Sequence, residues 1–373
     1  MKKTLKILTP NAHRADIGNL RFKPRKRLRD SPKPLRAAEY ALYKCFLAKY
    51  VIKDDKDDED KGWAPLYSQL MGSIAGNNKQ WSLVKAALIE AGYLECDNKW
   101  KYGTKSLCFR LGPLLADTTW DVSPDEFWMP EDPRPCMDWL TIDKPQAHLI
   151  IDEIAVEKSW DSRVTKGWHT RVENFSSHFQ ICKTGRAYSD ANQFPKRVRN
   201  TLLIDREPTA EIDIVNCQPM LLATIYPIQS EEWKRYKDLV EQGTVYESLA
   251  EFAELTRSEA KGELLPFIFG KPSLWAARYL SETFPELLEA IETRRKRHYK
   301  ALAFELQKKE SKIIVKRVCE QFKAASIHDG VRVKVSDAEA VKAFIESTIF
   351  ELWQLNPRIT IEHSDLPTLP KAA

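Results

Sequence analysis

Two stretches that lie far apart in the sequence each place a single aspartate at the end of a β-rich run. The first is Glu211-Ile-Asp-Ile-Val-Asn-Cys-Gln-Pro-Met-Leu222, in which Asp213 ends an apolar strand and a polar turn and a helical segment follow. The second is Ile327-His-Asp-Gly330, in which Asp329 separates two β-rich runs, the pattern of a hairpin. If these strands are neighbours, the two carboxylates can hold a pair of divalent metal ions, which in two-metal sites lie about 3.5–4 Å apart.

The composition favours a folded protein with two domains, or one large domain with an appendage. With 373 residues, 43% of them apolar and 10% aromatic, the chain can bury a substantial core. No uncharged apolar run reaches the ~18 residues of a membrane span and no apolar signal segment opens the chain, so we expect a cytoplasmic protein without a membrane partner. The seven cysteines are scattered without a Cys-x-x-Cys pair, which favours a reducing compartment over a cysteine zinc site.

Positive charge is concentrated near the N-terminus. Residues 1–36 contain twelve Lys and Arg against two Asp, a net charge of 12 − 2 = +10, and the whole chain carries +5, which leaves 5 − 10 = −5 for the rest. We therefore expect residues 1–36 to form a flexible, solvated basic arm. Such an arm suits binding to a nucleic-acid phosphate backbone; a solubilising tail or a targeting signal is the alternative.

Residues 37–112 show the pattern of a small DNA-binding domain. Helical periodicity is followed by a turn, a second helix and two strand-like runs joined by a basic loop. In order, the expected elements are a helix over 35–52, a short helix from Tyr67, a helix over 79–90, and strands over 93–96 and 106–111.

This order resembles a winged helix, a module that usually places its second helix in a DNA groove. The resemblance puts Asn78 and Lys79 at the base-reading end of that helix, and Lys101 and Lys105 on the wing. Because winged helices also serve as protein-docking modules, docking onto a protein is the alternative.

Residues 113–180 carry weaker patterns. The first part is rich in Pro, Trp and Asp, which is typical of a connector, and the part that follows is helical with a basic side. His148, His169 and His178 do not show a metal-ligand spacing, and we interpret each as a structural histidine. The chain contains neither a phosphate-binding glycine loop nor a zinc-protease motif.

An ordered run of polar residues surrounds Asp213 and carries a specific resemblance. The run comprises Thr184-Gly-Arg186, Asn192-Gln193, Pro195, Arg199, Asp213 and Gln218. It resembles the family A DNA polymerases, the group of bacterial repair and phage replicative enzymes. In that family a Thr-Gly-Arg element, an Asn-Leu-Gln-x-Ile-Pro element and an arginine precede a metal-binding Asp with a Glu five positions later. Here Phe194 stands where the family usually has two residues, and Gln218 replaces the Glu.

A second element spans residues 257–270. Arg257, Lys261, Leu265 and Phe269 recur at four-residue steps and share one helical face, which suits a nucleoside triphosphate: the cations neutralise phosphates and the ring stacks on the base. The element resembles the family's nucleotide-binding helix, with Phe269 for its Tyr. Leu265 stands where the family has an aromatic residue that senses the sugar, and Pro266 is expected to kink the helix.

The third element runs from Gln307 to Val318 and on into residues 327–335. It resembles the family's helix that opens with a minor-groove-contacting Gln, followed by a hairpin with His-Asp-Glu, and Gly330 replaces that Glu. The resemblance implies that Gln307 and His328 contact the duplex and that Asp329 is the second metal ligand.

Together the three elements imply an α+β fold. Residues 181–373 are expected to form a right-hand polymerase palm, an antiparallel sheet with helices, and reduced helical fingers; residues 113–180 are expected to be a connector and a reduced thumb-like region. The implied activity is that of a small DNA polymerase without a proofreading exonuclease, which extends a primer–template duplex with dNTPs.

The resemblance also implies the roles of single residues. Asp213 and Asp329 would hold two Mg²⁺ ions, or Mn²⁺. The residues that would bind the nucleotide are Arg257, Lys261, Phe269, Gln218 and Leu265. Lys261 would also protonate the leaving pyrophosphate. Arg186 would contact primer or template together with Gln307 and His328.

Two alternatives to this reading stay open. A primase or single-subunit RNA polymerase would share the palm and use rNTPs, and the departures at Gln218 and Leu265 leave room for a ribose. A non-catalytic replication initiator would bind DNA through the winged helix alone. A winged helix fused to a small polymerase suggests replication of a phage, plasmid or other mobile element in the cytoplasm of a bacterial or phage-infected cell.

Overall fold

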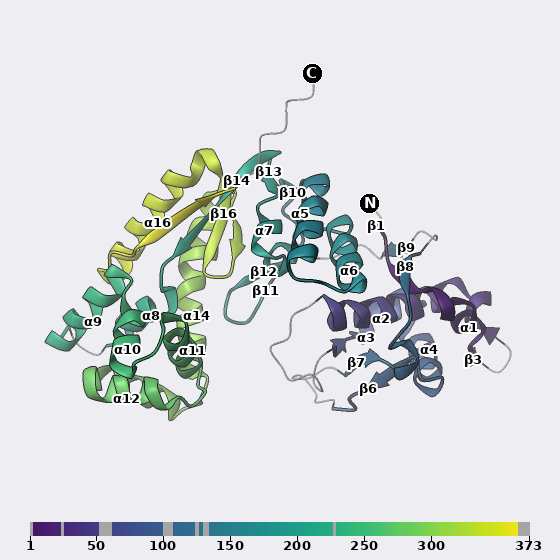
Figure 1. Ribbon diagram of the computed structural model, residues 1–373, viewed down its shortest axis with the longest axis horizontal. Helices are drawn as coiled ribbons and strands as arrows, with labels where there is room; N and C mark the ends of the chain where they lie inside the picture. Colours follow the sequence, from purple (N-terminus) through teal and green to yellow (C-terminus); the bar gives the residue numbers. More distant parts are fainter. Residues whose placement is uncertain are drawn as a thin grey trace, which may run out of the picture. The chain divides into compact units, whose positions relative to one another are not determined.

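The computed structural model describes residues 3–23, 26–51, 62–99, 107–123, 127–129, 134–226 and 229–364. The chain forms two compact units, residues 1–133 with 144–176 and residues 134–143 with 177–373 (Figure 1). The expected boundaries are at 36, 112 and 180, whereas here residues 134–143 belong to the second unit and residues 144–176 to the first. The fold is mixed α+β as expected, and the strand pairs in the described segments are antiparallel.

Three helices and a small sheet form the centre of the first unit. The helices are α2 (Pro32–Tyr50), α3 (Ser68–Ala75) and α4 (Asn78–Glu90), and the sheet has the order β5 (Ala64–Pro65), β7 (Cys108–Leu111), β6 (Leu94–Cys96). Gly76 ends α3 with a φ of 101°, and the Asn77 side chain accepts a hydrogen bond from the backbone N–H of Gln80 to cap α4. Trp81 and Leu88 are buried and lie on the core face of α4.

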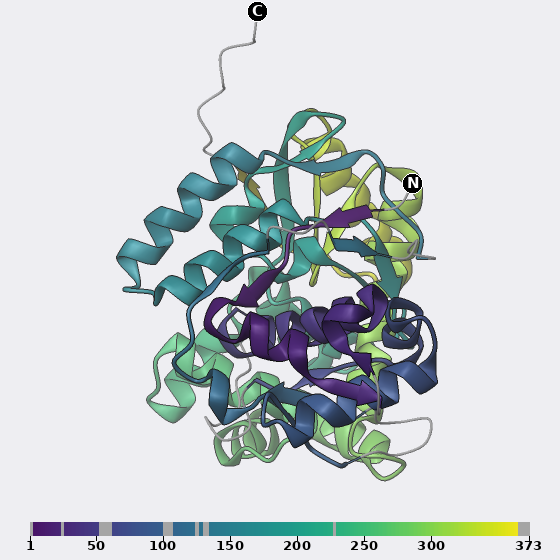
Figure 2. The same ribbon diagram turned by 90° about the vertical axis from the view of Figure 1, so that its right-hand side faces the viewer.

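The N-terminal segment is folded onto this core, so the expected flexible arm is wrong for residues 3–23 and 26–36 (purple in Figures 1 and 2). Ile7, Leu8, Phe22 and Leu28 alternate with the basic residues and are buried, which leaves the charges on the outer side. Apolar burial of this kind offsets the entropy of ordering the segment. Its elements are β1 (Lys3–Leu5) paired with β9 (Phe127–Met129), β2 (Leu8–Pro10) paired with β8 (Trp120–Val122), α1 (Arg14–Asn19), β3 (Arg21–Lys23) and β4 (Lys26–Arg27).

Two helices complete the first unit. α5 (Lys144–Glu157) and α6 (Ser162–Glu173) pack against each other, and α6 also packs on α2. The contact is close at Gly167, where a Cβ atom would lie 2.2 Å from Cγ2 of Val51. This packing places residues 144–176 with the N-terminal unit rather than in a separate connector.

An antiparallel sheet organises the second unit. Its order is β10 (Leu140–Ile142), β13 (Leu202–Ile204), β14 (Glu207–Ile214), β16 (Gly330–Lys334), β15 (Ala325–Ile327), and β17 (Ile359–His363) pairs with β14. The C-terminal helix α16 (Ala338–Trp353) packs on β14, β16 and β17. Within the segments described, no helix is long and apolar enough to cross a membrane.

Helices continue the core of the second unit away from the sheet. They are α8 (Cys217–Leu222), α9 (Glu231–Gln242), α10 (Val245–Ala253), α11 (Arg257–Ile268), α12 (Leu274–Thr283), α13 (Pro285–Arg295), α14 (Ala301–Ile313) and α15 (Cys319–Gln321), with a π-helical turn over Ile314–Val318. A capping box of Thr256 and Glu259 starts α11, and this helix runs through Pro266 to Ile268. A hairpin of β11 (Phe179–Ile181) and β12 (Ala187–Ser189) and the short α7 (Lys196–Arg199) precede β13.

Candidate active site

Strand pairing brings the two predicted aspartates together. Asp213 lies near the end of β14 and its Cα partner on β16 is Gly330, the residue that follows Asp329. Asp329 itself lies in the two-residue turn between β15 and β16, where His328 is exposed and adopts a left-handed φ of 53°. The two strands are therefore neighbours, which is the condition that the proposed pair of carboxylates requires.

Gly330 allows this approach. A Cβ atom at this position would lie 2.4 Å from the carbonyl oxygen of Ile212 and 3.3 Å from Oδ1 of Asp213. A glutamate, which the resembling family has here, would therefore push β16 away from β14. The glycine is a departure that keeps the Asp213 and Asp329 backbones close.

Replacing Gly330 with alanine is therefore expected to lower the free energy of unfolding by about 2–3 kcal/mol, because backbone atoms must move to make room. Urea unfolding followed by circular dichroism measures this. Gly262→Ala is the matched control, because Gly262 lies in α11 and a Cβ atom added there would meet no atom within 4 Å. That change should raise stability by about 0.5–1 kcal/mol; equal effects at both positions would contradict the close approach at Gly330.

Electrostatic repulsion marks the pair of aspartates. The pKa of Asp213 is raised to about 7, first by burial and then by the negative charges of Asp329 and Glu211. A carboxylate with a raised pKa beside a second carboxylate gains from a bound cation. Oxygen ligands of this kind suit Mg²⁺ or Mn²⁺, so the residues present fit the predicted metal ions.

A buried glutamate that the sequence analysis missed lies next to the aspartates. Glu310 on α14 has a side chain only 1% exposed, and Arg186 donates to it from Nε at 2.7 Å, while Gln218 donates from Nε2. Burial raises the pKa of Glu310; the Arg186 charge opposes this rise and the Asp329 charge adds to it. Glu310 follows the buried Leu306 by one helical turn, and this acidic residue on an apolar helix face is the signal that could have revealed it.

The Thr-Gly-Arg element is anchored on the same helix. Gly185 has a φ of 89°, and a Cβ there would lie 3.1 Å from Cβ of Ser311 on α14. Arg186, predicted to contact primer or template, is held by Glu310 instead of projecting freely. Gln307 lies one turn before Glu310 and is half-buried, so α14 brings Arg186 and Gln307 to one region.

Gln218 carries an unsatisfied polar atom close to this cluster. Its side chain is 6% exposed, and its amide nitrogen donates to Glu310. Its carbonyl oxygen Oε1 has no hydrogen-bond partner within the described part of the chain. Buried acceptors without a donor are uncommon in proteins, so this oxygen is available to a ligand.

Tyr246 on α10 lies between the predicted nucleotide-binding helix, α11, and the aspartates. The Arg257 guanidinium lies 5.5 Å from the Tyr246 ring centroid and pairs with Glu247 at 2.7 Å. Burial raises the pKa of Tyr246, and the charge of Asp329 raises it further. One buried ring thus lies near both Arg257 and Asp329.

The other predicted residues of α11 divide into two groups. Lys261 is exposed one turn after Arg257. Leu265 and Phe269 are half-buried against the core, and Phe269 follows the last residue of the helix. The cations therefore face solvent, whereas the two apolar residues are partly used in packing.

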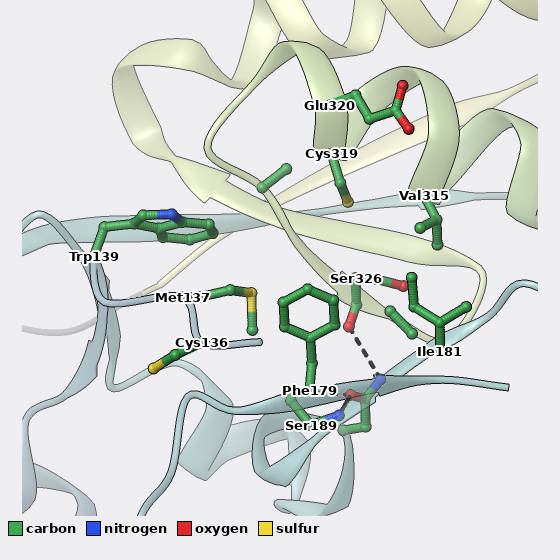
Figure 3. Close-up of a pocket in the computed structure, with 13 residues that line it drawn as sticks. Cys136, Met137, Trp139, Phe179, Ile181, Ser189, Val315, Cys319, Glu320 and Ser326 are labelled. Atoms are coloured by element: carbon green, nitrogen blue, oxygen red, sulfur yellow. Dashed lines mark hydrogen bonds between the residues drawn. The ribbon is translucent and has the colours of Figure 1, made fainter. Parts of the chain in front are cut away.

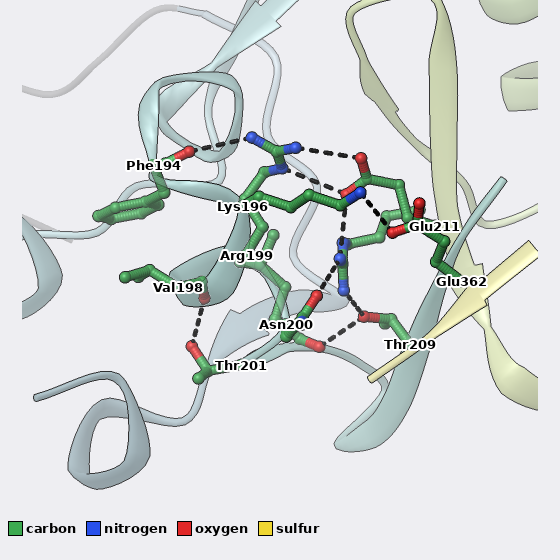
Figure 4. A network of polar contacts seen from close by, with 11 residues as sticks. Phe194, Lys196, Val198, Arg199, Asn200, Thr201, Thr209, Glu211 and Glu362 are labelled. Carbon is green, nitrogen blue, oxygen red and sulfur yellow. Dashed lines mark hydrogen bonds and ion pairs between the residues drawn. The ribbon is translucent and has the colours of Figure 1, made fainter. Parts of the chain in front are cut away.

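A buried ionic network fixes the strand that carries Asp213 (Figure 4). Glu211 accepts hydrogen bonds from Arg199 at 3.0 Å and from Arg332 at 3.0 Å, and Arg332 also donates to Asn200 and Thr209. The Arg332 side chain is 1% exposed. Burial would raise the pKa of Glu211, but the two arginines outweigh this and lower it.

A cavity of about 320 Å³ lies beside the β11–β12 hairpin, apart from the aspartates (Figure 3). Trp139, Phe179 and Ile181 line it on one side and Val315 and Cys319 on the other. The lining is largely apolar, and it includes neither Asp213 nor Asp329.

The predicted DNA-reading residues of the first unit are on its surface. Asn78 and Lys79 are exposed in the first turn of α4. β3, with the exposed Arg21, packs beside α4, and Lys33 lies near Gly76 at the α3–α4 turn. Lys101 and Lys105 lie outside the described residues.

Neither a protein-family model nor a curated protein matches this chain. We therefore base the function on the geometry around Asp213 and Asp329.

Proposed function

We propose that the protein is a template-directed nucleotidyltransferase, most simply a small DNA polymerase. It joins the 3′-hydroxyl of a primer to the α-phosphate of a dNTP and releases pyrophosphate. One observation carries this proposal: Asp213 and the Asp329 turn lie side by side at the β14–β16 pairing, where burial and then the negative charge of Asp329 raise the pKa of Asp213. Two such carboxylates are the ligand set of two-metal phosphoryl transfer.

The aspartates Asp213 and Asp329 would hold Mg²⁺ or Mn²⁺. When bound, these ions lower the pKa of the attacking hydroxyl and neutralise the leaving phosphates. Arg257 and Lys261, both exposed and one helical turn apart, bind the triphosphate, and Lys261 donates a proton to the departing pyrophosphate. Phe269 offers one face to the base.

Primer contact is assigned to the region around α14. The Arg186 guanidinium is held by Glu310, which accepts from its Nε at 2.7 Å, and Gln307 lies one helical turn before Glu310 on α14. Arginine donors in a fixed orientation suit the acceptors of a duplex minor groove. His328, exposed in the β15–β16 turn, adds a contact near the primer end.

The first unit supplies binding to duplex DNA. The order α2, β5, α3, α4, β6, β7 and the pairing of β7 with β5 and β6 support a winged-helix assignment. Arg21 and Lys33 beside α4 extend the positive charge around Lys79. This unit would therefore bind the phosphate backbone with a strong salt dependence.

Replacing Lys79 with alanine should weaken duplex binding about fivefold at ~100 mM salt, because one phosphate contact is lost. Gel mobility shift with the full-length protein measures this. Lys85→Ala is the control on the same helix, since the Lys85 ammonium lies 5.8 Å from the Phe109 ring centroid. Equal weakening by both variants would argue against groove contact through the start of α4.

A primase or RNA polymerase is the second candidate, and Gln218 favours it. The buried Oε1 atom without a donor could accept a hydrogen bond from a sugar hydroxyl near Asp213. The family's Glu at this position is replaced, so the sequence offers no assurance that ribose is rejected.

Primer extension tests both candidates. Full-length protein is mixed with Mg²⁺, a primed or unprimed template, and either dNTPs or rNTPs. Extension of the primer with dNTPs supports the DNA polymerase; extension or de novo synthesis with rNTPs supports the second candidate. DNA binding without incorporation of either nucleotide would instead support a non-catalytic initiator.

A further inference from the structure

Two histidines of the first unit face each other across the α5–α6 pair. His148 on α5 and His169 on α6 have ring centroids 4.7 Å apart, and their Nδ1 atoms are 2.5 Å apart. Both side chains are partly exposed, 27% and 29%, so solvent reaches them. Their spacing in the sequence gives no hint of this meeting, because it arises from the packing of two helices.

Each ring is fixed at its other nitrogen by a carboxylate. Nε2 of His148 lies 2.9 Å from Glu173, and Nε2 of His169 lies 2.9 Å from Asp152. Glu173 is also paired with Lys6 at 3.2 Å and Lys144 at 3.5 Å, which keeps it ionised and able only to accept. Both Nε2 atoms therefore carry the ring proton and donate.

This assignment leaves the two Nδ1 atoms as acceptors. Their lone pairs point at each other at 2.5 Å, an arrangement that is repulsive unless a cation lies between them. Histidine rings whose second nitrogen donates to a carboxylate are the usual form of metal-ligating histidines, because the carboxylate fixes the tautomer and raises the basicity of the ligand nitrogen.

We propose that His148 and His169 bind one divalent transition-metal ion, of the Zn²⁺ or Ni²⁺ class, through their Nδ1 atoms. Metal–nitrogen bonds of about 2.0–2.1 Å in a tetrahedral site place the two nitrogens roughly 3.3 Å apart, so the rings need to separate by less than an ångström. Over the described ranges no three His, Cys, Asp or Glu side chains form a metal-holding group, so water completes the coordination.

The ion would tie together three segments of the first unit. It joins α5 to α6 directly, and Glu173 extends the connection to Lys6, whose backbone N–H also donates to Asn174. Imidazole ligands discriminate against Mg²⁺, which prefers oxygen. The histidine site and the Asp213–Asp329 pair therefore prefer different metals. If the histidines bind no metal, the proposed polymerase activity is unaffected.

Equilibrium dialysis of the chelator-treated, full-length protein against NiCl₂ tests the proposal, and Ni²⁺ is chosen to limit binding by the seven cysteines. One Ni²⁺ should bind per chain at micromolar concentration. His148→Ala and His169→Ala should each weaken binding at least tenfold, and Glu173→Gln about tenfold through loss of the ring orientation. His298→Ala, at an exposed histidine of the second unit, should change nothing.

Thermal unfolding gives a second readout. Saturating Ni²⁺ should raise the unfolding temperature of the wild type by several degrees and leave that of the His148→Ala, His169→Ala double variant unchanged. The proposal is contradicted if the wild type binds no more Ni²⁺ than this folded double variant. In that case a proton, and not a metal ion, lies between the two rings. Equal Ni²⁺ binding by all variants would overturn it as well.

Discussion

Asp213→Asn is expected to raise the free energy of unfolding at pH 8, in the absence of divalent ions, by on the order of 2 kcal/mol. Burial and the Asp329 charge raise the pKa of Asp213 to about 7, well above the ~3.9 of an unfolded chain. The folded state therefore holds its proton over a range in which the unfolded state has lost it. The free energy of unfolding consequently falls as the pH rises from about 4 to above 7. Asparagine carries no charge at any of these pH values, so it removes this loss.

Urea unfolding at pH 5 and pH 8 in a chelator measures this effect. The gain from Asp213→Asn should be clearly larger at pH 8 than at pH 5. Asp238→Asn makes the same charge change at an exposed position of α9 and should alter stability by less than about 0.5 kcal/mol. A loss of stability in Asp213→Asn at both pH values would show that the carboxylate is favourably paired, against the repulsion inferred from its burial beside Asp329.

Glu211→Gln is expected to lower the free energy of unfolding by about 3 kcal/mol, and up to about 5 if the strand rearranges. The change removes the carboxylate that forms an ion pair with Arg332, whose side chain is 1% exposed, and it also weakens the pairing with Arg199. A buried guanidinium without a counter-charge is costly. The partners are fixed by β14, β16 and α7, so they cannot move to water without loss of the sheet.

Glu207→Gln is the matched control for Glu211→Gln. Glu207 lies on the same face of β14, four residues earlier, and pairs with Lys334 while 55% exposed. An exposed pair contributes less than about 1 kcal/mol. Urea unfolding of both variants compares them, and similar losses at the two positions would contradict a special role for the buried network around Arg332.

Local pattern was enough to predict the elements that carry the proposed site. Alternating apolar residues around Asp213 predict β14, and helical periodicity predicts α4 and α11 close to their observed bounds. A strand end at Asp213 and a hairpin turn at Asp329 also show in the residue types, whereas the pairing of β14 with β16 is seen only in the structure.

The features that were missed depend on contacts between distant residues. Glu310 stands out in the sequence only as an acidic residue on an apolar helix face, and its partner Arg186, 124 residues away, is seen only in the structure. The basic N-terminal residues were expected to remain in solvent, yet a few apolar residues between them pack on the first unit. His148 and His169 meet only because α5 packs on α6. Sequence periodicity reports on one element at a time and not on its partners.

The division into two units shows the same limit. Composition led us to expect a connector within residues 113–180, but composition could not show that residues 144–176 belong to the first unit. In the first unit, α6 packs so closely that Gly167 leaves no room for a Cβ atom beside Val51. A close contact of this kind between distant residues cannot be read from composition.

Single-nucleotide incorporation by the wild type, Asp213→Asn, Asp329→Asn and the double variant tests the central claim most directly. With a primer–template duplex, Mg²⁺ and a saturating nucleotide, each single change should reduce the rate roughly a thousandfold or more, and the double variant should be no worse, since the two carboxylates act as one unit. Duplex binding by gel mobility shift should stay within about threefold of the wild type. An active wild type whose rate falls less than tenfold in either single variant would contradict the assignment of Asp213 and Asp329 as the metal-holding pair.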